Sequence, residues 1–144
     1  MSHRWLEHTS ELELLIDAPS ERGVFEEAAE ALGELAHESD EVASEREVER
    51  GGDERAAACR VSVTGTDRAA LLAAFLEELV YLLETRDLVP EGVADLRLGE
   101  DRVTATVRGH TGLTPRHVVK AVTYNELTFA RRGGRFTATV VLDV

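Results

Sequence analysis

The segment over residues 71–83 constrains the fold most strongly, because its apolar side chains recur at helical spacing. Side chains three and four positions apart lie on one face of an α-helix, so the segment predicts an amphipathic helix. Thr66 or Asp67 is placed to cap its first turn. We interpret the apolar face as core rather than as a cofactor site, and it consists of Leu71, Leu72, Phe75, Leu76, Leu79, Val80, Leu82 and Leu83.

A second helix is predicted after Ser20, a candidate N-cap that follows Pro19. Its apolar stripe ends before residues 37–41, and we expect a charged edge strand over residues 42–48, because charge discourages pairing with other chains. The stripe consists of Val24, Phe25, Ala28, Ala29, Leu32, Leu35 and Ala36.

The remaining apolar runs predict strands separated by turns. We expect strands over residues 11–17, 57–63, 93–98, 102–108, 118–130 and 136–142. We expect turns or loops at 51–53, 90–92, 99–101, 109–117 and 133–134. The order of elements predicts one α+β domain over residues 1–144, in which two helices pack on one face of a mostly antiparallel sheet.

Acidic residues outnumber basic ones by 28 to 16, so the net charge is −12. Such a chain repels phosphate backbones, which argues against direct, tight binding of nucleic acid. It can still act beside an RNA enzyme whose own surface is basic. The N-terminus lacks the apolar run of a signal peptide and no run approaches the ~20 residues of a membrane helix, so we expect a cytoplasmic protein.

The single cysteine, Cys59, excludes both an intrachain disulfide and a thiolate zinc site, and we expect a buried, inert thiol. A zinc site of histidine and carboxylate ligands stays open, since His8 and His117 are present.

Lys120 is the only lysine among sixteen basic residues, and it lies in the apolar run 118–124. A compact ammonium is not interchangeable with a guanidinium fork, so Lys120 is a candidate functional group. Chance, or neutralisation of a nearby carboxylate, is the structural alternative. If residues 133–134 form the turn of a hairpin, Asp143 lies opposite Tyr124 and Asn125, which brings the last strand close to Lys120.

Three segments together resemble the archease family: Leu6-Glu7-His8-Thr9-Ser10-Glu11, Val118-Val119-Lys120-Ala121-Val122-Thr123-Tyr124 and Val140-Val141-Leu142-Asp143-Val144. Family members begin with a His-Thr-Ala-Asp motif, carry Val-Lys-Ala-Val-Thr-Tyr late in the chain and end one residue after an aspartate. Residues 25–32 and 76–82 are similar to the two helices of the family. The resemblance implies a fold built around a strand–helix–strand–strand module.

The resemblance also implies a divalent cation bound by Glu11 and Asp143, with oxygen atoms of Val144 as further ligands. Ca²⁺ is the expected ion, because hard cations take carboxylate and carbonyl oxygens. The chain departs from the family at Glu11, where aspartate is usual. A second change from aspartate to glutamate occurs at Glu84, and Asn125 stands where the family often has histidine. The segment 109–117 is shorter than usual, so His110 and His117 are not matched to family histidines.

The function implied by the resemblance is activation of the GTP-dependent RNA-splicing ligase of the RtcB type. The family promotes guanylylation and multiple turnover of this enzyme in tRNA splicing. The chain itself would not be an enzyme, and it would meet tRNA only through the ligase. His8, Thr9, Lys120 and Tyr124 are the expected contacts to the partner. Their structural alternatives are a turn, a cap, a neutralising charge and core packing.

Two other classes of function stay open. A small metal-dependent hydrolase would use the same carboxylates, but the sequence has no Gly-x-Ser-x-Gly elbow, no evident nucleophile–base pair and no phosphate-binding glycine loop. A general chaperone or ligand-binding module is the third reading, because a fold does not fix a function.

Overall fold

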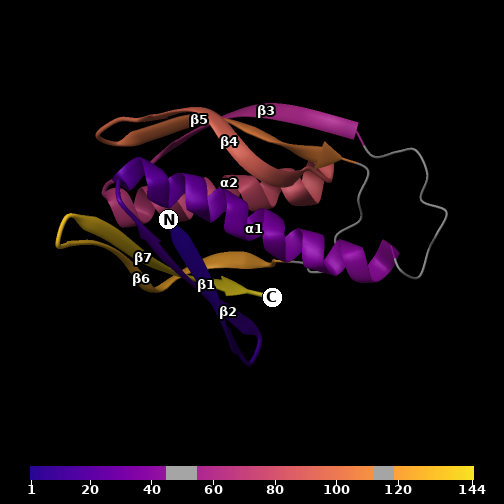
Figure 1. Ribbon diagram of the computed structural model, residues 1–144, viewed down its shortest axis with the longest axis horizontal. Coiled ribbons are helices and arrows are strands. Elements are labelled where there is room, and N and C mark those ends of the chain that lie inside the picture. Colours follow the sequence, from indigo (N-terminus) through magenta and orange to yellow (C-terminus); the bar gives the residue numbers. More distant parts are fainter. Residues whose placement is uncertain (45–54, 112–118) are drawn as a thin grey trace.

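The computed structural model describes residues 1–44, 55–111 and 119–144 (Figure 1). The elements, in chain order, are β1 (Ser2–His8), β2 (Glu11–Ala18), α1 (Glu21–Ser44), β3 (Arg55–Thr64), α2 (Arg68–Arg86), β4 (Val89–Leu98), β5 (Arg102–Thr111), β6 (Ala121–Arg132) and β7 (Arg135–Asp143).

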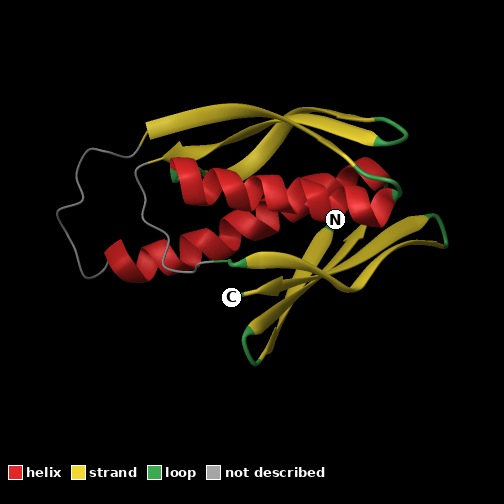
Figure 2. Cartoon of the chain, turned by 180° about the vertical axis from the view of Figure 1, so that it is seen from behind, coloured by secondary structure: helices red, strands yellow, loops and turns green. Residues whose placement is uncertain are grey.

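The strands form two antiparallel sheets, and both helices lie between them (Figures 1 and 2). The larger sheet has the order β1-β2-β7-β6 and the smaller one the order β3-β5-β4. Helix α1 contacts β2 and β4, whereas α2 contacts β3 and β6, so each helix touches both sheets. The predicted α+β class, the antiparallel pairing and the two helices are confirmed. The division into two sheets was not predicted.

Helix α2 forms as its apolar periodicity predicts. The Asp67 carboxylate accepts a hydrogen bond of 2.8 Å from the Ala70 amide, so Asp67 rather than Thr66 is the N-cap. All eight apolar positions of the predicted face are buried. Phe75 meets Phe25 of α1 edge to face at a centroid distance of 5.6 Å, and this contact joins the two helices at the centre of the core.

Helix α1 begins as predicted, since the Ser20 hydroxyl accepts a 3.0 Å hydrogen bond from the Gly23 amide. The expected end before residues 37–41 is wrong, because the helix continues to Ser44. Residues 37–44 contain neither glycine nor proline, so nothing in the backbone stops the helix where the apolar stripe ends. The expected strand over 42–48 is therefore wrong for 42–44. Its remainder and the expected turn at 51–53 lie outside the described residues.

Three further predictions need correction. The expected turn at 90–92 lies within β4, where the register shifts between Pro90 and Gly92, so the two residues mark a bulge instead of a chain reversal. Residues 109–111, expected in a loop, extend β5, while residues 112–117 of that loop lie outside the described residues. Cys59 is half-buried on β3 and lies 3.5 Å from a guanidinium nitrogen of Arg86, so the thiol is not the fully buried one expected.

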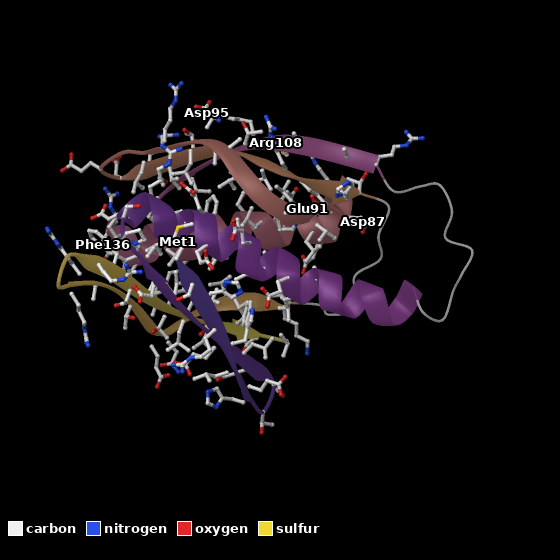
Figure 3. All side chains as sticks on the ribbon, in the orientation of Figure 1. Met1, Asp87, Glu91, Asp95, Arg108 and Phe136 are labelled. Carbon is white, nitrogen blue, oxygen red and sulfur yellow. The ribbon has the colours of Figure 1, made fainter. Side chains whose placement is uncertain are left out.

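The outer face of the smaller sheet is polar. Asp95 and Arg108 point away from the helices on this side (Figure 3), and the Arg60 guanidinium pairs with Asp95 at 3.2 Å. Exposed ion pairs of this kind add little to the stability of the fold. We interpret this face as solvated surface. Among the described residues, neither helix combines the length and apolar composition that a membrane crossing requires.

Helix α1 approaches β4 so closely that only glycine fits at position 33. A Cβ atom there would overlap the carbonyl oxygen of Pro90. We expect Gly33→Ala to lower the free energy of unfolding by about 1–3 kcal/mol, even though alanine is the better helix former. Gly92→Ala is the matched control, since a Cβ atom there meets nothing within 4 Å, and should change stability by no more than about 0.5 kcal/mol. Urea denaturation of both variants checks this; equal stability would contradict the close approach.

Strand β1, which was not predicted, is fastened to α1 by a histidine held between two carboxylates. His3 Nδ1 lies 2.7 Å from Glu27 and Nε2 lies 2.8 Å from Glu34. Glu27 is buried to 5% exposure. Burial opposes protonation of His3, but the hydrogen bonds and charges of both glutamates outweigh it and raise the His3 pKa above 6.5.

The raised pKa makes a testable prediction for stability. Because protonation is favoured in the folded state, the contribution of His3 is fully present below about pH 6.5 and is lost as pH rises through the folded-state pKa. We expect His3→Gln to destabilise the protein more at about pH 6 than at about pH 9. Denaturation of wild type and variant at both pH values measures the difference, which Glu34→Gln should reduce. An equal loss at both pH values would mean that His3 acts by packing alone.

Candidate functional site

The candidate site lies where the β1–β2 hairpin meets the end of β7. His8 and Glu11 face each other across the two-residue turn Thr9-Ser10, in which Ser10 adopts a left-handed conformation with φ of 61°. The Val144 amide donates a 3.1 Å hydrogen bond to the carbonyl oxygen of Ser10. The turn is therefore tied to the last residue of the chain.

Glu11 and Asp143 are direct neighbours across the β2–β7 pair. Residues that lie opposite each other in an antiparallel pair project to the same face of the sheet, about 4.5–5.5 Å apart at Cβ. On the other side of Asp143 lies Ala121 of β6, and the Lys120 amide donates a 2.8 Å hydrogen bond to the Asp143 carbonyl. Three strands thus bring Glu11, Asp143 and Lys120 to one end of the larger sheet, which we call the tip.

The register of the β6–β7 hairpin corrects one prediction. Gly133 and Gly134 form the turn with φ of 57° and 79°, as expected. Asp143 nevertheless lies opposite Ala121 and not opposite Tyr124 and Asn125. The reason is an irregularity between Thr123 and Thr128, where β6 has more residues than the facing part of β7 and Glu126 takes φ of 58°. Asp143 therefore lies nearer to Lys120 in space than a one-to-one count of residues from the turn predicts.

The two tip carboxylates face each other without a compensating charge from the described part of the chain. Among the described residues, Glu11 and Asp143 form no ion pair, and the exposed ammonium of Lys120 forms none either. Like charges directly opposite one another destabilise a sheet. A bound cation would therefore reduce the repulsion between the two tip carboxylates.

The donor set at the tip fits a hard cation only in part. Glu11 and Asp143 supply carboxylate oxygens, the ligands that Ca²⁺ prefers. Among the described residues, however, no group of three or more histidine, cysteine, aspartate or glutamate side chains is arranged to bind a metal. A shell of six to eight oxygens would need backbone or solvent oxygens as well. His117, the other candidate zinc ligand, lies outside the described residues.

The other predicted site residues lie at different distances from the tip. His8 is half-exposed, and its Nε2 lies 3.1 Å from Glu13, so it contacts a carboxylate next to the tip. Thr9 is exposed in the turn. Tyr124 lies further along β6, beside α2, where burial and the charge and hydrogen bond of Glu77 raise the pKa of its hydroxyl. The core-packing reading of Tyr124 does not hold, since 58% of the residue is exposed.

A cavity of about 520 Å³ opens beside the tip, between the hairpin and α1. Three of its lining residues, His8, Glu11 and Val144, are predicted site residues, whereas the sequence does not single out Trp5, Glu7 and Glu34. Trp5 and Glu7 are two positions apart on β1, so their side chains lie on the same face of the strand. This relation can be recognised only once the stretch is known to be a strand. Glu34 comes from α1, and nothing local links it to the hairpin. The cavity is lined by Trp5, Glu7, His8, Glu11, Leu12, Glu34, Leu35 and Val144.

The chain is similar to known proteins over nearly its whole length. Residues 3–144 match the family described as the Archease protein family (MTH1598/TM1083). The protein archease of Methanosarcina mazei is 31% identical over 150 residues, an alignment that covers 99% of this chain and 95% of the relative.

Two solved structures share the fold. The solution structure of Methanobacterium thermoautotrophicum protein 1598 has a TM-score of 0.70 and 25% identity, covering 99% of this chain and 98% of the other. The crystal structure of an archease from Thermotoga maritima, described as a possible chaperone, has a TM-score of 0.62 and 17% identity, covering 100% of this chain and 98% of the other. With the sequence match over residues 3–144, the shared fold shows that the chain belongs to the archease family.

Proposed function

We propose that this protein activates a GTP-dependent RNA-splicing ligase of the RtcB type, promoting its guanylylation and multiple turnover in tRNA splicing. Membership of the archease family supports the proposal. The observation that carries it is the pairing of Glu11 with Asp143 next to Lys120, since it assembles three separate sequence segments at one end of the larger sheet. The chain acts by binding and not by chemistry of its own.

The tip would enter or border the active site of the ligase. Glu11 and Asp143 would hold a divalent cation, Ca²⁺ being the expected one, with a backbone oxygen of Val144 as a third ligand. When bound, such an ion supplies positive charge and open coordination positions for oxygens of the partner. Lys120 is exposed, its backbone amide is bound to the Asp143 carbonyl, and its ammonium would contact a phosphate or carboxylate of the ligase complex. His8 and Thr9 flank the tip on the hairpin.

The charge of the whole chain suits such a partner. A net charge of −12 favours encounter with a basic, RNA-binding protein surface, because complementary potentials steer association. The same charge disfavours RNA itself, so tRNA would be reached through the ligase. A cytoplasmic location follows from this role.

Calcium binding predicts a stabilisation that depends on the tip carboxylates. At about 100 times its Kd, Ca²⁺ should raise the free energy of unfolding by about 2.7 kcal/mol. Glu11→Gln and Asp143→Asn should abolish the increase, while Glu100→Gln, which makes the same charge change at an exposed turn of the other sheet, should keep it. Thermal unfolding with and without CaCl₂ measures the effect.

Chelation gives the reverse comparison for the same variants. In excess EGTA, Asp143→Asn should be as stable as wild type or more stable by about 0.2–1 kcal/mol, because it removes a like-charge pair. If Asp143→Asn is instead much less stable in EGTA, Asp143 has a structural role that the cation does not explain.

The activating role is tested by guanylylation of the cognate ligase with GTP, with and without catalytic amounts of this protein. We expect stimulation by wild type and its loss in Glu11→Ala, Lys120→Ala and Asp143→Ala, each shown to be folded by circular dichroism. Stimulation that survives all three changes would keep the function and move the site. No stimulation by folded wild type would sink the proposal.

General chaperone activity is a second candidate, because the related Thermotoga maritima structure is described as a possible chaperone. Suppression of aggregation of unrelated unfolded proteins, unaffected by the tip variants, would favour it over a dedicated ligase activator.

A further inference from the structure

Both tyrosines of this chain are exposed, and they lie on the same side of the molecule. Tyr81 of α2 is 56% exposed and Tyr124 of β6 is 58% exposed. Strand β6 contacts α2, and burial together with the charge of Glu77 on α2 raises the pKa of the Tyr124 hydroxyl, so Glu77 lies close to Tyr124. Tyr81 follows Glu77 by four residues, so the two lie one turn apart on the same helix face. Glu77 therefore brings the two rings into one surface.

The surface continues along both elements. Glu84 lies three residues beyond Tyr81 on the exposed side of α2. On β6, Glu126 follows Tyr124 within the irregular stretch and is exposed. We call Glu77, Tyr81, Glu84 and Tyr124 the tyrosine surface.

The irregularity in β6 is what presents Tyr124. Ladder pairing with β7 stops at Thr123 and resumes at Thr128, so Tyr124 is released from the ladder. Bulges of this kind bend an edge strand and re-aim its side chains. A left-handed residue such as Glu126, with φ of 58°, costs free energy that regular pairing would avoid. The irregular stretch of β6 is therefore strained, and it leaves the Tyr124 ring exposed beside α2.

The chemistry of this surface matches that of a protein interface. Tyrosine combines a large apolar ring with few rotatable bonds, and it is enriched among the residues that contribute most to binding. A tyrosine side chain also loses little conformational entropy when it is covered, because it has only two rotatable side-chain bonds before the hydroxyl. The glutamates around the rings give the surface a negative rim, which is complementary to arginine and lysine of a partner.

Strand β6 connects the tip to the tyrosine surface. Ala121, which faces Asp143, precedes Tyr124 by three residues, a distance of about 10 Å along a strand. A partner that covers Tyr124 therefore has the tip within reach of its own surface. We propose that the tyrosine surface docks against a basic, arginine-rich patch of the ligase and so sets the position of the tip. This inference rests on the proposed function. It assigns affinity for the ligase to the tyrosine surface and activation of the ligase to the tip.

The two surfaces are separated by titrating guanylylation against the concentration of this protein. We expect Tyr81→Ala and Tyr124→Ala each to raise the concentration for half-maximal stimulation about tenfold, with an unchanged maximum. Asp143→Ala should lower the maximum instead. Tyr81→Phe keeps the ring and should stay close to wild type. Glu84→Gln should raise the half-maximal concentration more than Glu100→Gln, which makes the same charge change on a remote turn.

Direct binding of the purified ligase, measured by calorimetry, distinguishes failure of this inference from failure of the proposed function. If wild type binds without stimulating and the tyrosine variants bind more weakly, the docking surface stands and the proposed function falls. The inference is overturned if wild type does not bind, or if the variants bind and stimulate like wild type. Tyr81 lies on an exposed helix face, so Tyr81→Ala leaves the core intact. The inference is also overturned if sedimentation shows that wild type self-associates and that Tyr81→Ala does not.

Discussion

The pairing of β2 with β7 is the interaction on which the rest of the structure depends. It joins segments from opposite ends of the chain, from Glu11 opposite Asp143 to Ala18 opposite Phe136. Closing so long a loop costs conformational entropy, which burial of apolar side chains must offset. Leu14, Ile16, Val140 and Leu142 are all 0–2% exposed, and each contributes about 1.5–3 kcal/mol by burial. These inward-facing residues set the register, and a slip by one residue would turn Glu11 away from Asp143.

The charge of this protein is organised more finely than its net value shows. At the tip, two carboxylates face each other with no partner charge from the described residues, an arrangement suited to cation binding. At His3, two carboxylates instead share one imidazole and fasten an edge strand to α1. The same residue types thus leave two like charges facing each other in one place and form a structural bond in another. The difference is whether a cationic side chain of the protein lies between them.

Local patterns in the sequence predicted much of the fold. Both helices, their N-caps and both late hairpins follow from apolar periodicity and turn residues. The errors share a physical cause. Strand β1 has little apolar alternation and forms because β2 and His3 hold it, while α1 runs past its apolar stripe because nothing breaks its backbone. Pro90 and Gly92 resemble turn residues but lie in a bulge that tertiary pairing tolerates.

For the site, the sequence by itself determined three candidate side chains, Glu11, Lys120 and Asp143, each in a segment that resembles the archease family. It also determined that the C-terminal hairpin brings Lys120 near Asp143. Only the tertiary structure decided that Glu11 faces Asp143, since strand order is a long-range property that no local pattern encodes. It also decided the three-residue displacement of Tyr124 from Asp143, because the irregularity in β6 breaks the one-to-one count of residues along the hairpin.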